Sequence, residues 1–251
     1  MRAKVANHDS GTVDPGEIGR FAAQSAAWWD PAGSFAPLHR LNPVRLDYIR
    51  TELLSHFGRD PRALHPFEGL SLLDIGCGGG LVAEPMTRLG FRVVAIDAGA
   101  EAIAVARAHA EDSGLAIDYR VATAEALAAE GMQFDAVLAL EIVEHVADLE
   151  ALFAAVGALV RPGGAFVGAT LNRTLRSFAL AIVGAEYVLN WLPRGTHDWQ
   201  RFVRPSEFVL GLRRNGFAAT RLAGMSYSVL SGTWSPTGDL STNYMLTAVK
   251  K

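Results

Sequence analysis

The chain has 251 residues, of which half are hydrophobic, and it carries a formal net charge of −3. This length fits one large domain with a substantial core, and the acidic balance argues against a general nucleic-acid binder, which would usually be basic. The only cysteine, Cys77, excludes an internal disulfide and fits a reducing compartment.

The first 60 residues predict a helical lid ahead of the core. Residues 1–15 have few large apolar groups and are expected to form a mobile tail, and the charged N-terminus lacks the apolar core of a signal peptide. Apolar residues recur at helical spacing from Glu17 to Trp29. A second helix is predicted to start at Asn42-Pro43 and to end near Phe57. We expect residues 35–45 to be irregular and residues 16–60 to form the lid.

Strands and helices then alternate along the chain. Strands are predicted at 71–75, 92–96, 117–121, 134–139 and 164–170, and helices at 81–89, 99–113, 123–130, 148–159 and 205–214. This alternation predicts a parallel sheet with helices on both faces. Residues 161–164 predict a sharp turn, and 217–226 with 242–249 predict an antiparallel hairpin at the sheet edge. The expected fold is α/β, a seven-stranded and mostly parallel sheet in one domain, residues 1–251.

A short buried strand runs directly into a glycine loop at residues 72–80. Four of the five residues after Ile75 are glycines, and a helical pattern starts near Leu81. Such a turn lets a ligand contact bare backbone and points the N-terminus of a helix at that ligand. The stretch therefore predicts a nucleotide-type cofactor site, in which Cys77 is expected to be a small packed thiol rather than a nucleophile.

Two details of this loop favour S-adenosylmethionine (SAM) over a dinucleotide. The dinucleotide fingerprint needs glycine at its first, third and sixth positions, whereas here Gly76 and Gly78 are followed by Leu81 at the sixth. Asp74, just before the turn, would repel a pyrophosphate and attract an ammonium group. SAM has a ribose and an adenine but no phosphate.

A second acid, Asp97, ends the next predicted strand, about 20 residues after the glycines. A carboxylate there can accept hydrogen bonds from both ribose hydroxyls. The alternative is that the glycines form only a tight turn and that Asp97 caps a helix. The occurrence of strand, glycines, helix, strand and acid in this order favours the cofactor site.

Acidic and imidazole side chains follow the fourth predicted strand. Leu140 would be an apolar surface for the cofactor, and Glu141, Glu144 and His145 have a spacing that would bring them to one side of a helical turn. These three could bind a hard divalent cation. Alternatively His145 is a general base, or Glu144 and His145 only hydrogen-bond to nearby backbone.

Either catalytic role would help to transfer a methyl group to a phenol. A free phenol, with a pKa of about 10, is a weak nucleophile near neutral pH. A cation bound by two adjacent ring oxygens, or a base that takes the proton, would produce the reactive phenolate. The site must then align oxygen, methyl carbon and sulfur away from water.

A long insertion, residues 171–204, follows the fifth predicted strand. Residues 177–193 contain many large apolar side chains with Glu186 as their one charge, and Arg173, Arg176 and Arg194 flank them. The segment is predicted either as a helix packed over the active site or as an interfacial helix that contacts an anionic bilayer. No run of the chain reaches the roughly 18 uninterrupted apolar residues of a spanning helix.

Several longer segments are similar to one known family. They are residues 28–30 (Trp-Trp-Asp), 37–45, 73–80, 141–145, 170–173, 183–187, 195–198 (Gly-Thr-His-Asp) and 243–246. Across nearly its whole length the chain resembles the ubiquinone biosynthesis O-methyltransferases of bacteria and mitochondria. The glycine loop alone would indicate only a class I SAM methyltransferase, with its Rossmann-like fold, whereas residues 39–43 and 195–198 are more specific.

The resemblance implies a set of site residues and a reaction. It implies SAM contacts at Arg45, Gly76, Asp97 and Leu140, to which the loop adds Asp74 and Gly78, and a magnesium site at Glu141, Glu144 and His145. The implied acceptors are ring hydroxyls of 2-polyprenyl-6-hydroxyphenol and of 3-demethylubiquinol. A cytoplasmic protein, peripheral to the inner membrane and associated with other ubiquinone biosynthesis proteins, would fit. Leu140 stands where relatives can carry methionine and keeps the apolar contact.

Other functions stay open beside the leading one. A SAM-dependent enzyme could act on another small phenolic acceptor. A nicotinamide-dependent oxidoreductase is disfavoured by Leu81 and Asp74. A non-catalytic, membrane-associated scaffold with a SAM-binding fold is the third alternative.

Overall fold

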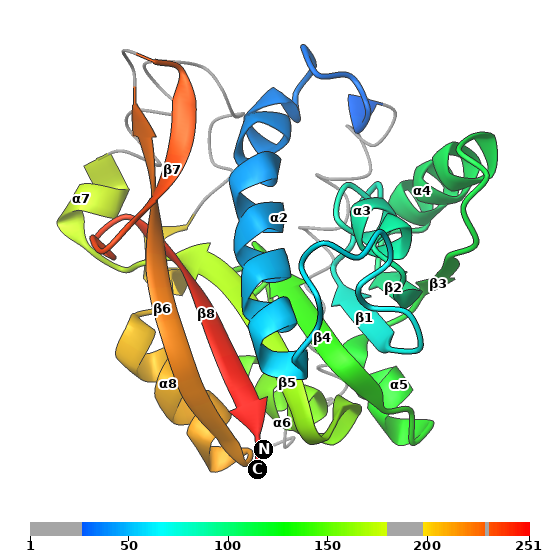
Figure 1. The fold of residues 1–251 in the computed structure, drawn as a ribbon. Coiled ribbons are helices and arrows are strands. Elements are labelled where there is room, and N and C mark those ends of the chain that lie inside the picture. The colour runs from blue at the N-terminus through cyan, green and yellow to red at the C-terminus, as the bar shows by residue number, and fades with distance from the viewer. Residues whose placement is uncertain (1–26, 180–197, 229–230) are drawn as a thin grey trace, which may run out of the picture.

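Figure 1 shows the protein as a computed structural model, which describes residues 27–179, 198–228 and 231–251. Its elements are α2 (Ala36–Phe57), β1 (Ser71–Ile75), α3 (Ala83–Arg88), β2 (Arg92–Asp97), α4 (Ala100–Asp112), β3 (Asp118–Val121), α5 (Ala124–Ala129), β4 (Phe134–Leu140), α6 (Leu149–Leu159), β5 (Val160–Leu171), α7 (Leu175–Ser177), η3 (Trp199–Arg201), α8 (Pro205–Arg214), β6 (Phe217–Ser228), β7 (Thr233–Thr237) and β8 (Asn243–Lys250). The predicted alternation of strands and helices in the core is confirmed.

The strands form one eight-stranded sheet with the order β3-β2-β1-β4-β5-β8-β6-β7. The first five strands in this order are parallel, β8 is antiparallel to both β5 and β6, and β7 is antiparallel to β6. The strand order reverses between β1 and β4. In open α/β sheets the carboxyl ends of the strands at such a point form the ligand-binding crevice.

The sheet has one strand more than the seven that the sequence predicts. The additional strand, β7, lies where we expected only a connection, and it pairs with β6 at the edge of the sheet. It contains Pro236, and none of its five residues is buried. An exposed edge strand with a proline lacks the apolar pattern that identifies a buried strand.

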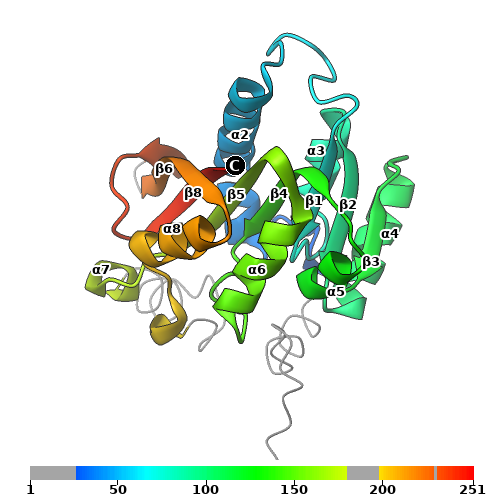
Figure 2. The same cartoon turned by 90° about the horizontal axis from the view of Figure 1, so that it is seen from below.

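Helices cover both faces of the sheet. Side chains of α2, α3 and α4 pack on one face together with Leu72 of β1, and those of α5, α6 and α8 pack on the other face together with Leu73. Figure 2 shows the sheet between α2 and α3 on one side and α5, α6 and α8 on the other. Because successive side chains of a strand point to opposite faces, two adjacent leucines contribute to both cores.

Helix α2 corrects one prediction. It begins at Ala36 and contains Pro43, so residues 35–45 are not irregular and the helix does not start at Asn42. Pro37 suits the first turn, where the missing N–H has no partner to lose. Pro43 removes one helical hydrogen bond, yet the helix continues because its buried side chains, Leu41 to Leu54, pack against the sheet and the glycine loop. Tertiary packing outweighs the loss of this one hydrogen bond.

Strand β5 begins before the predicted turn. Val160 pairs with Phe134 and Ala165 with Ala136, so residues 161–164 bulge out of the ladder. Gly163 has a φ of 76° in this bulge. The glycine turn that we predicted is therefore an interruption within β5.

Three sequence predictions lie wholly or mostly outside the described residues. The tail at 1–15 and nearly all of the helix from Glu17 to Trp29 fall in residues 1–26, and most of the insertion falls in residues 180–197. Among the helices that the structure describes, none is both long and apolar enough to span a membrane.

Candidate active site

The glycine loop is held to the end of β2. The backbone N–H groups of Gly76 and Cys77 donate to the carbonyl oxygen of Ile96 at 2.8 and 3.0 Å. Gly76, Gly78 and Gly80 all have positive φ, between 52° and 91°. Other residues strain in this conformation, so the glycines set the shape of the loop. Cys77 is buried, and burial raises the pKa of its thiol, as expected for a packed thiol.

Two aromatic side chains, Trp28 and Tyr119, contact the glycines of this loop closely. Trp28 contacts it so closely that a Cβ atom on Gly79 would lie 2.6 Å from the indole, and the ring also covers Gly78. Trp28 itself stacks on Phe35 with 3.8 Å between the ring centroids. The hydroxyl of Tyr119, from β3, blocks the Cβ position of Gly80. We did not predict these contacts, although the Trp-Trp-Asp segment marked the place of Trp28.

Asp97 joins the loops that follow β1 and β2. Its Oδ2 accepts the N–H of Gly78 at 3.0 Å and its Oδ1 accepts the N–H of Gly99 at 2.8 Å. Burial raises the pKa of this carboxyl, and the two backbone hydrogen bonds oppose that shift. Asp97 thus stands at the predicted place and shapes the loop. Its contact with a ribose stays a prediction.

Three charged side chains lie close together near the carboxyl ends of the strands, namely Arg45 of α2, Asp74 of β1 and Glu141 just after β4. Arg45 is 4% exposed, and its Nη2 donates to Asn42 Oδ1 at 3.1 Å. Burial lowers the pKa of Arg45, while the charges of Glu141 and Asp74 oppose that shift. Burial raises the pKa of Asp74 to about 7, although Arg45 acts in the other direction. The structure therefore brings these three predicted site residues together.

Polar atoms around the loop are buried without a hydrogen-bond partner. Within the described part of the chain they are Trp28 Nε1, Arg45 Nε, Asp74 Oδ2 and Tyr119 Oη, and both carboxylate oxygens of Glu125 in α5 share this property. A buried polar group without a partner costs about 1–3 kcal/mol. Donors and acceptors left open at one loop fit a polar ligand that supplies the missing bonds.

The residues after β4 form a turn and no helix. Leu140 is the last, buried residue of β4, and Glu141 has a φ of 52°, which is unusual for a residue with a side chain. The N–H of Glu141 donates to Ala169 at 2.9 Å, and that of His145 donates to Ile142 at 2.9 Å. The helical turn that we predicted for these residues is therefore wrong.

Glu144 is deeply buried in this turn and engaged by its neighbours. Thr170 Oγ1 donates to its Oε2 at 2.7 Å. Burial raises the pKa of Glu144, while hydrogen bonds with its own backbone, with Thr170 and with the side chain of Glu141 oppose that shift. Within the described residues no three His, Cys, Asp or Glu side chains are grouped to hold a metal ion. Glu141, Glu144 and His145 are therefore not grouped as the implied magnesium triad in the described structure, and that site stays a prediction from the family.

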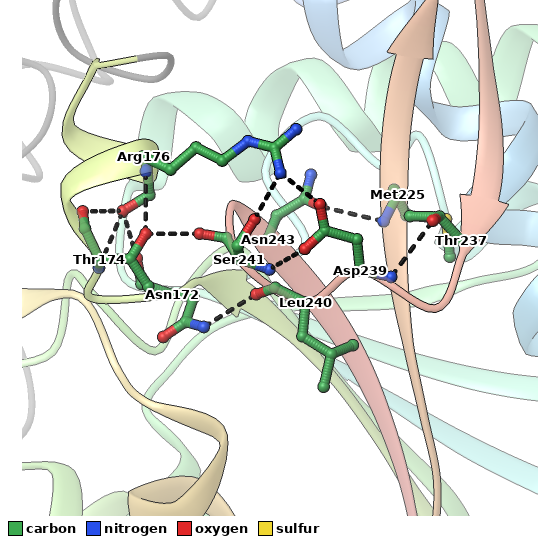
Figure 3. A network of polar contacts seen from close by, with 10 residues as sticks. Asn172, Thr174, Arg176, Met225, Thr237, Asp239, Leu240, Ser241 and Asn243 are labelled. Carbon is green, nitrogen blue, oxygen red and sulfur yellow. Dashed lines mark hydrogen bonds and ion pairs between the residues drawn. The ribbon is translucent and has the colours of Figure 1, made fainter.

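A polar network fixes the base of the insertion at the same edge of the sheet (Figure 3). Arg176 of α7 pairs with Asp239 and donates to Ser241 Oγ at 3.0 Å. Thr174 Oγ1 donates to the carbonyl of Ser241 at 2.5 Å, and Asn172 Nδ2 donates to that of Leu240 at 2.8 Å. These bonds join the end of β5 to the connection between β7 and β8.

Comparison with known proteins identifies a family model and close relatives of the chain. A family model described as a methyltransferase domain matches residues 73–168. The chain is 55% identical to a ubiquinone biosynthesis O-methyltransferase of Paramagnetospirillum magneticum, with 100% of both chains covered. It is 54% identical to the protein of that name from Parvibaculum lavamentivorans, with 94% of each covered.

Solved structures share the fold at low sequence identity. A magnesium protoporphyrin IX methyltransferase from Synechocystis with bound SAH matches with a TM-score of 0.63 and 17% identity, over 93% of this chain and 94% of that one. A SAM-dependent methyltransferase from Thermotoga maritima matches with a TM-score of 0.60 and 16% identity, over 94% and 99%. The predicted class I methyltransferase fold is confirmed. The chain belongs to the ubiquinone biosynthesis O-methyltransferase family.

Proposed function

We propose that the protein is a SAM-dependent O-methyltransferase of ubiquinone biosynthesis. It methylates a ring hydroxyl of polyprenyl catechol-type intermediates, 2-polyprenyl-6-hydroxyphenol and 3-demethylubiquinol. The name of the relatives, at 52–55% identity over 93% or more of their length, supports the pathway. The charged side chains near the glycine loop support SAM as the cofactor.

The observation that carries this proposal is the pair Arg45 and Asp74. Both are buried, they have opposite charges, and Nε of one and Oδ2 of the other lack partners among the described residues. The methionine part of SAM carries a carboxylate and an ammonium group. Arg45 would bind the former and Asp74 the latter, so that one zwitterion satisfies both. A pyrophosphate would leave the carboxylate of Asp74 unpaired and repelled.

The remaining residues of the crevice suit the rest of the molecule. Asp97 keeps acceptor capacity for ribose hydroxyls, because each of its oxygens has accepted one backbone N–H. Leu140 supplies apolar surface at the end of β4. When bound, SAM supplies a methyl group on a positively charged sulfur. The protein must then exclude water and hold the acceptor oxygen in line with the methyl carbon and the sulfur.

The acceptor must lose its phenolic proton, and we assign this step to His145. It is half-buried in the turn after β4, at the carboxyl edge of the sheet, and imidazole exchanges protons near neutral pH. The buried bond between Glu144 and Thr170 holds the turn that carries it. The magnesium site stays a prediction from the family, and no step is assigned to it. Exhaustive chelation followed by magnesium addition tests it directly.

The insertion is proposed to cover the acceptor pocket and to contact anionic lipid, peripheral to the inner membrane. Leu175 and Phe178, at its start, are 81% and 43% exposed. A polyprenyl tail partitions into a bilayer, so an enzyme at the surface needs to admit only the aromatic head. The association with other proteins of the pathway is carried by the family resemblance alone.

Methyl transfer from labelled SAM to a short-chain demethylubiquinol tests the proposal. Transfer to the ring hydroxyl is expected, and calorimetry should show binding of SAM and none of NAD. If the protein binds SAM but transfers the methyl group only to another small phenol, the proposed acceptor is wrong and the cofactor assignment stands. SAM binding without any transfer would favour the scaffold.

A further inference from the structure

The segment before α2 is docked on the glycine loop through two consecutive indoles. Trp28 covers Gly78 and Gly79. Trp29 Nε1 donates a hydrogen bond to the carbonyl oxygen of Gly79 at 3.0 Å. Because the loop contains four glycines, fixing its backbone in one conformation costs more conformational entropy than it would for other residues. The hydrogen bond from Trp29 to Gly79 therefore restricts a backbone that glycine alone would leave adaptable.

The indole of Trp29 is itself supported from α4. Its ring stacks on His109, with 3.5 Å between the centroids and an interplanar angle of 2°. His109 Nδ1 lies 2.5 Å from Oε1 of Glu84. Because a carboxylate only accepts, Nδ1 carries the hydrogen, and this bond sets the orientation of the ring against which Trp29 lies.

Glu84 connects this stack to the helix that leaves the loop. It lies in the first turn of α3, is 0% exposed, and its N–H donates to the carbonyl of Gly80 at 3.1 Å. A buried carboxylate is tolerated only when it is paired. One oxygen pairs with Arg88 at 3.1 Å, and the other holds His109. The chain of contacts thus begins and ends at the glycine loop.

We propose that Glu84, His109 and Trp29 form a positioning relay that holds the carbonyl of Gly79, and with it the loop, in the conformation that binds the cofactor. The inference rests on the proposed function, which makes SAM the ligand of this loop. The three residues act through the loop backbone and are positioning residues. Pre-organisation of a binding loop reduces the conformational entropy that the loop loses when the ligand binds. The relay therefore sets SAM affinity, whereas the acceptor side is unaffected.

The test compares SAM binding with acceptor kinetics in relay variants. Trp29→Phe keeps a stacking ring and loses the donor to Gly79, and His109→Ala loses both the stack and the bond to Glu84. Each should raise the Kd and KM for SAM about three- to thirtyfold, the range for residues that act on a site without touching its ligand. The kcat at saturating SAM and the KM for short-chain demethylubiquinol should stay within about twofold.

Rescue and non-additivity separate a relay from general support of the fold. His109→Gln keeps a donor for Glu84 without the stack, and His109→Phe keeps the stack without the donor, so each should restore only part of the SAM affinity. The double variant Trp29→Phe, His109→Ala should lose no more than the worse single variant. His56→Ala is the matched control. His56 also makes one side-chain hydrogen bond, to Gly163 at 2.9 Å, and one ring contact, with Phe57, but it lies near the start of β5, away from the carboxyl ends of the strands.

The outcomes are distinguishable. Unchanged SAM affinity in folded Trp29→Phe would overturn the relay, as would equal losses for SAM and acceptor, or an equal loss in His56→Ala. Absence of SAM binding by the wild-type chain would instead contradict the proposed function. If His109→Ala does not fold, Trp29→Phe and His109→Phe decide the question, since both retain an aromatic ring at the stack.

Discussion

Arg45 and Asp74 are buried neighbours of opposite charge that do not satisfy each other. Each favours the ionised form of the other, yet Arg45 Nε and Asp74 Oδ2 have no hydrogen-bond partner in the described chain. Burial raises the pKa of Asp74 to about 7 in spite of Arg45. These two atoms are therefore left without partners, and a ligand that carries both charges would supply them.

The first prediction follows from the proton on Asp74. The raised pKa means that the unliganded folded protein holds this proton up to about pH 7, whereas the unfolded chain loses it near pH 4. The contribution of Asp74 to the free energy of unfolding is thus fully present below about pH 4, and it is lost as the pH rises through 7. An ammonium group needs the ionised carboxylate, so SAM binding should release one proton below pH 7.

Calorimetry between pH 5.5 and 8.5 measures this effect. The Kd for SAM should fall about tenfold per pH unit up to about 7 and then level off. Asp74→Asn should bind SAM weakly with no such dependence. A pH dependence that persists in Asp74→Asn would assign the proton to another group.

The second prediction concerns Asp97. Asp97→Ala should weaken SAM binding more than tenfold, since two ribose hydroxyls lose their acceptor at about 1–2 kcal/mol each. The same change frees the N–H groups of Gly78 and Gly99. Asp97→Asn keeps one acceptor oxygen and should lose less. Thermal unfolding separates the loss of loop structure from the loss of the ribose contact. Unchanged affinity in folded Asp97→Ala would refute the assignment.

The third prediction tests the strain at Glu141. Its φ of 52° costs a residue with a Cβ about 1–2 kcal/mol, which glycine avoids. Glu141→Gly should therefore be more stable than Glu141→Ala by about 1 kcal/mol in denaturant unfolding, although glycine usually destabilises. Both variants lose the carboxylate equally, so the difference reports the backbone alone. Equal stability of the two would show that the conformation carries no strain.

The fourth prediction concerns Glu144 and Thr170. Glu144→Gln should reduce methyl transfer more than SAM binding, since this turn is assigned to the acceptor side. Thr170→Val removes the donor to a deeply buried carboxyl and should lower the free energy of unfolding by about 1–3 kcal/mol. A comparable loss of SAM affinity in Glu144→Gln would move the residue to the cofactor side.

The fifth prediction concerns the base of the insertion. Replacing Leu175 and Phe178 with Ser should lower binding to anionic liposomes and activity on a long-tailed substrate, because each apolar side chain buried in lipid contributes roughly 1.5–3 kcal/mol. Activity on a tailless analogue should change less. Leu64→Ser is the control, because Leu64 is 81% exposed, as is Leu175, but lies in the connection between α2 and β1. Equal losses on both substrates with unchanged liposome binding would indicate an internal lid.

Local patterns in the sequence were sufficient for the core and the cofactor loop. A fully buried parallel strand such as β1 needs a continuous apolar run, and only glycine tolerates the positive φ values of Gly76, Gly78 and Gly80 without strain. Alternating strands and helices then require the parallel sheet, which places Asp74 and Asp97 at one edge. Each of these inferences depends on residues close together in the chain.

The contacts that complete the site depend on residues far apart in the chain, so only the tertiary structure decided them. Trp29 reaches Gly79 across 50 positions, a pairing that no local pattern encodes. The turn after β4 has helical spacing, yet Glu141 leaves the helical conformation because its N–H is bonded to Ala169 of β5. That long-range hydrogen bond is formed by strand pairing, and in the folded sheet it outweighs the local preference for a helix.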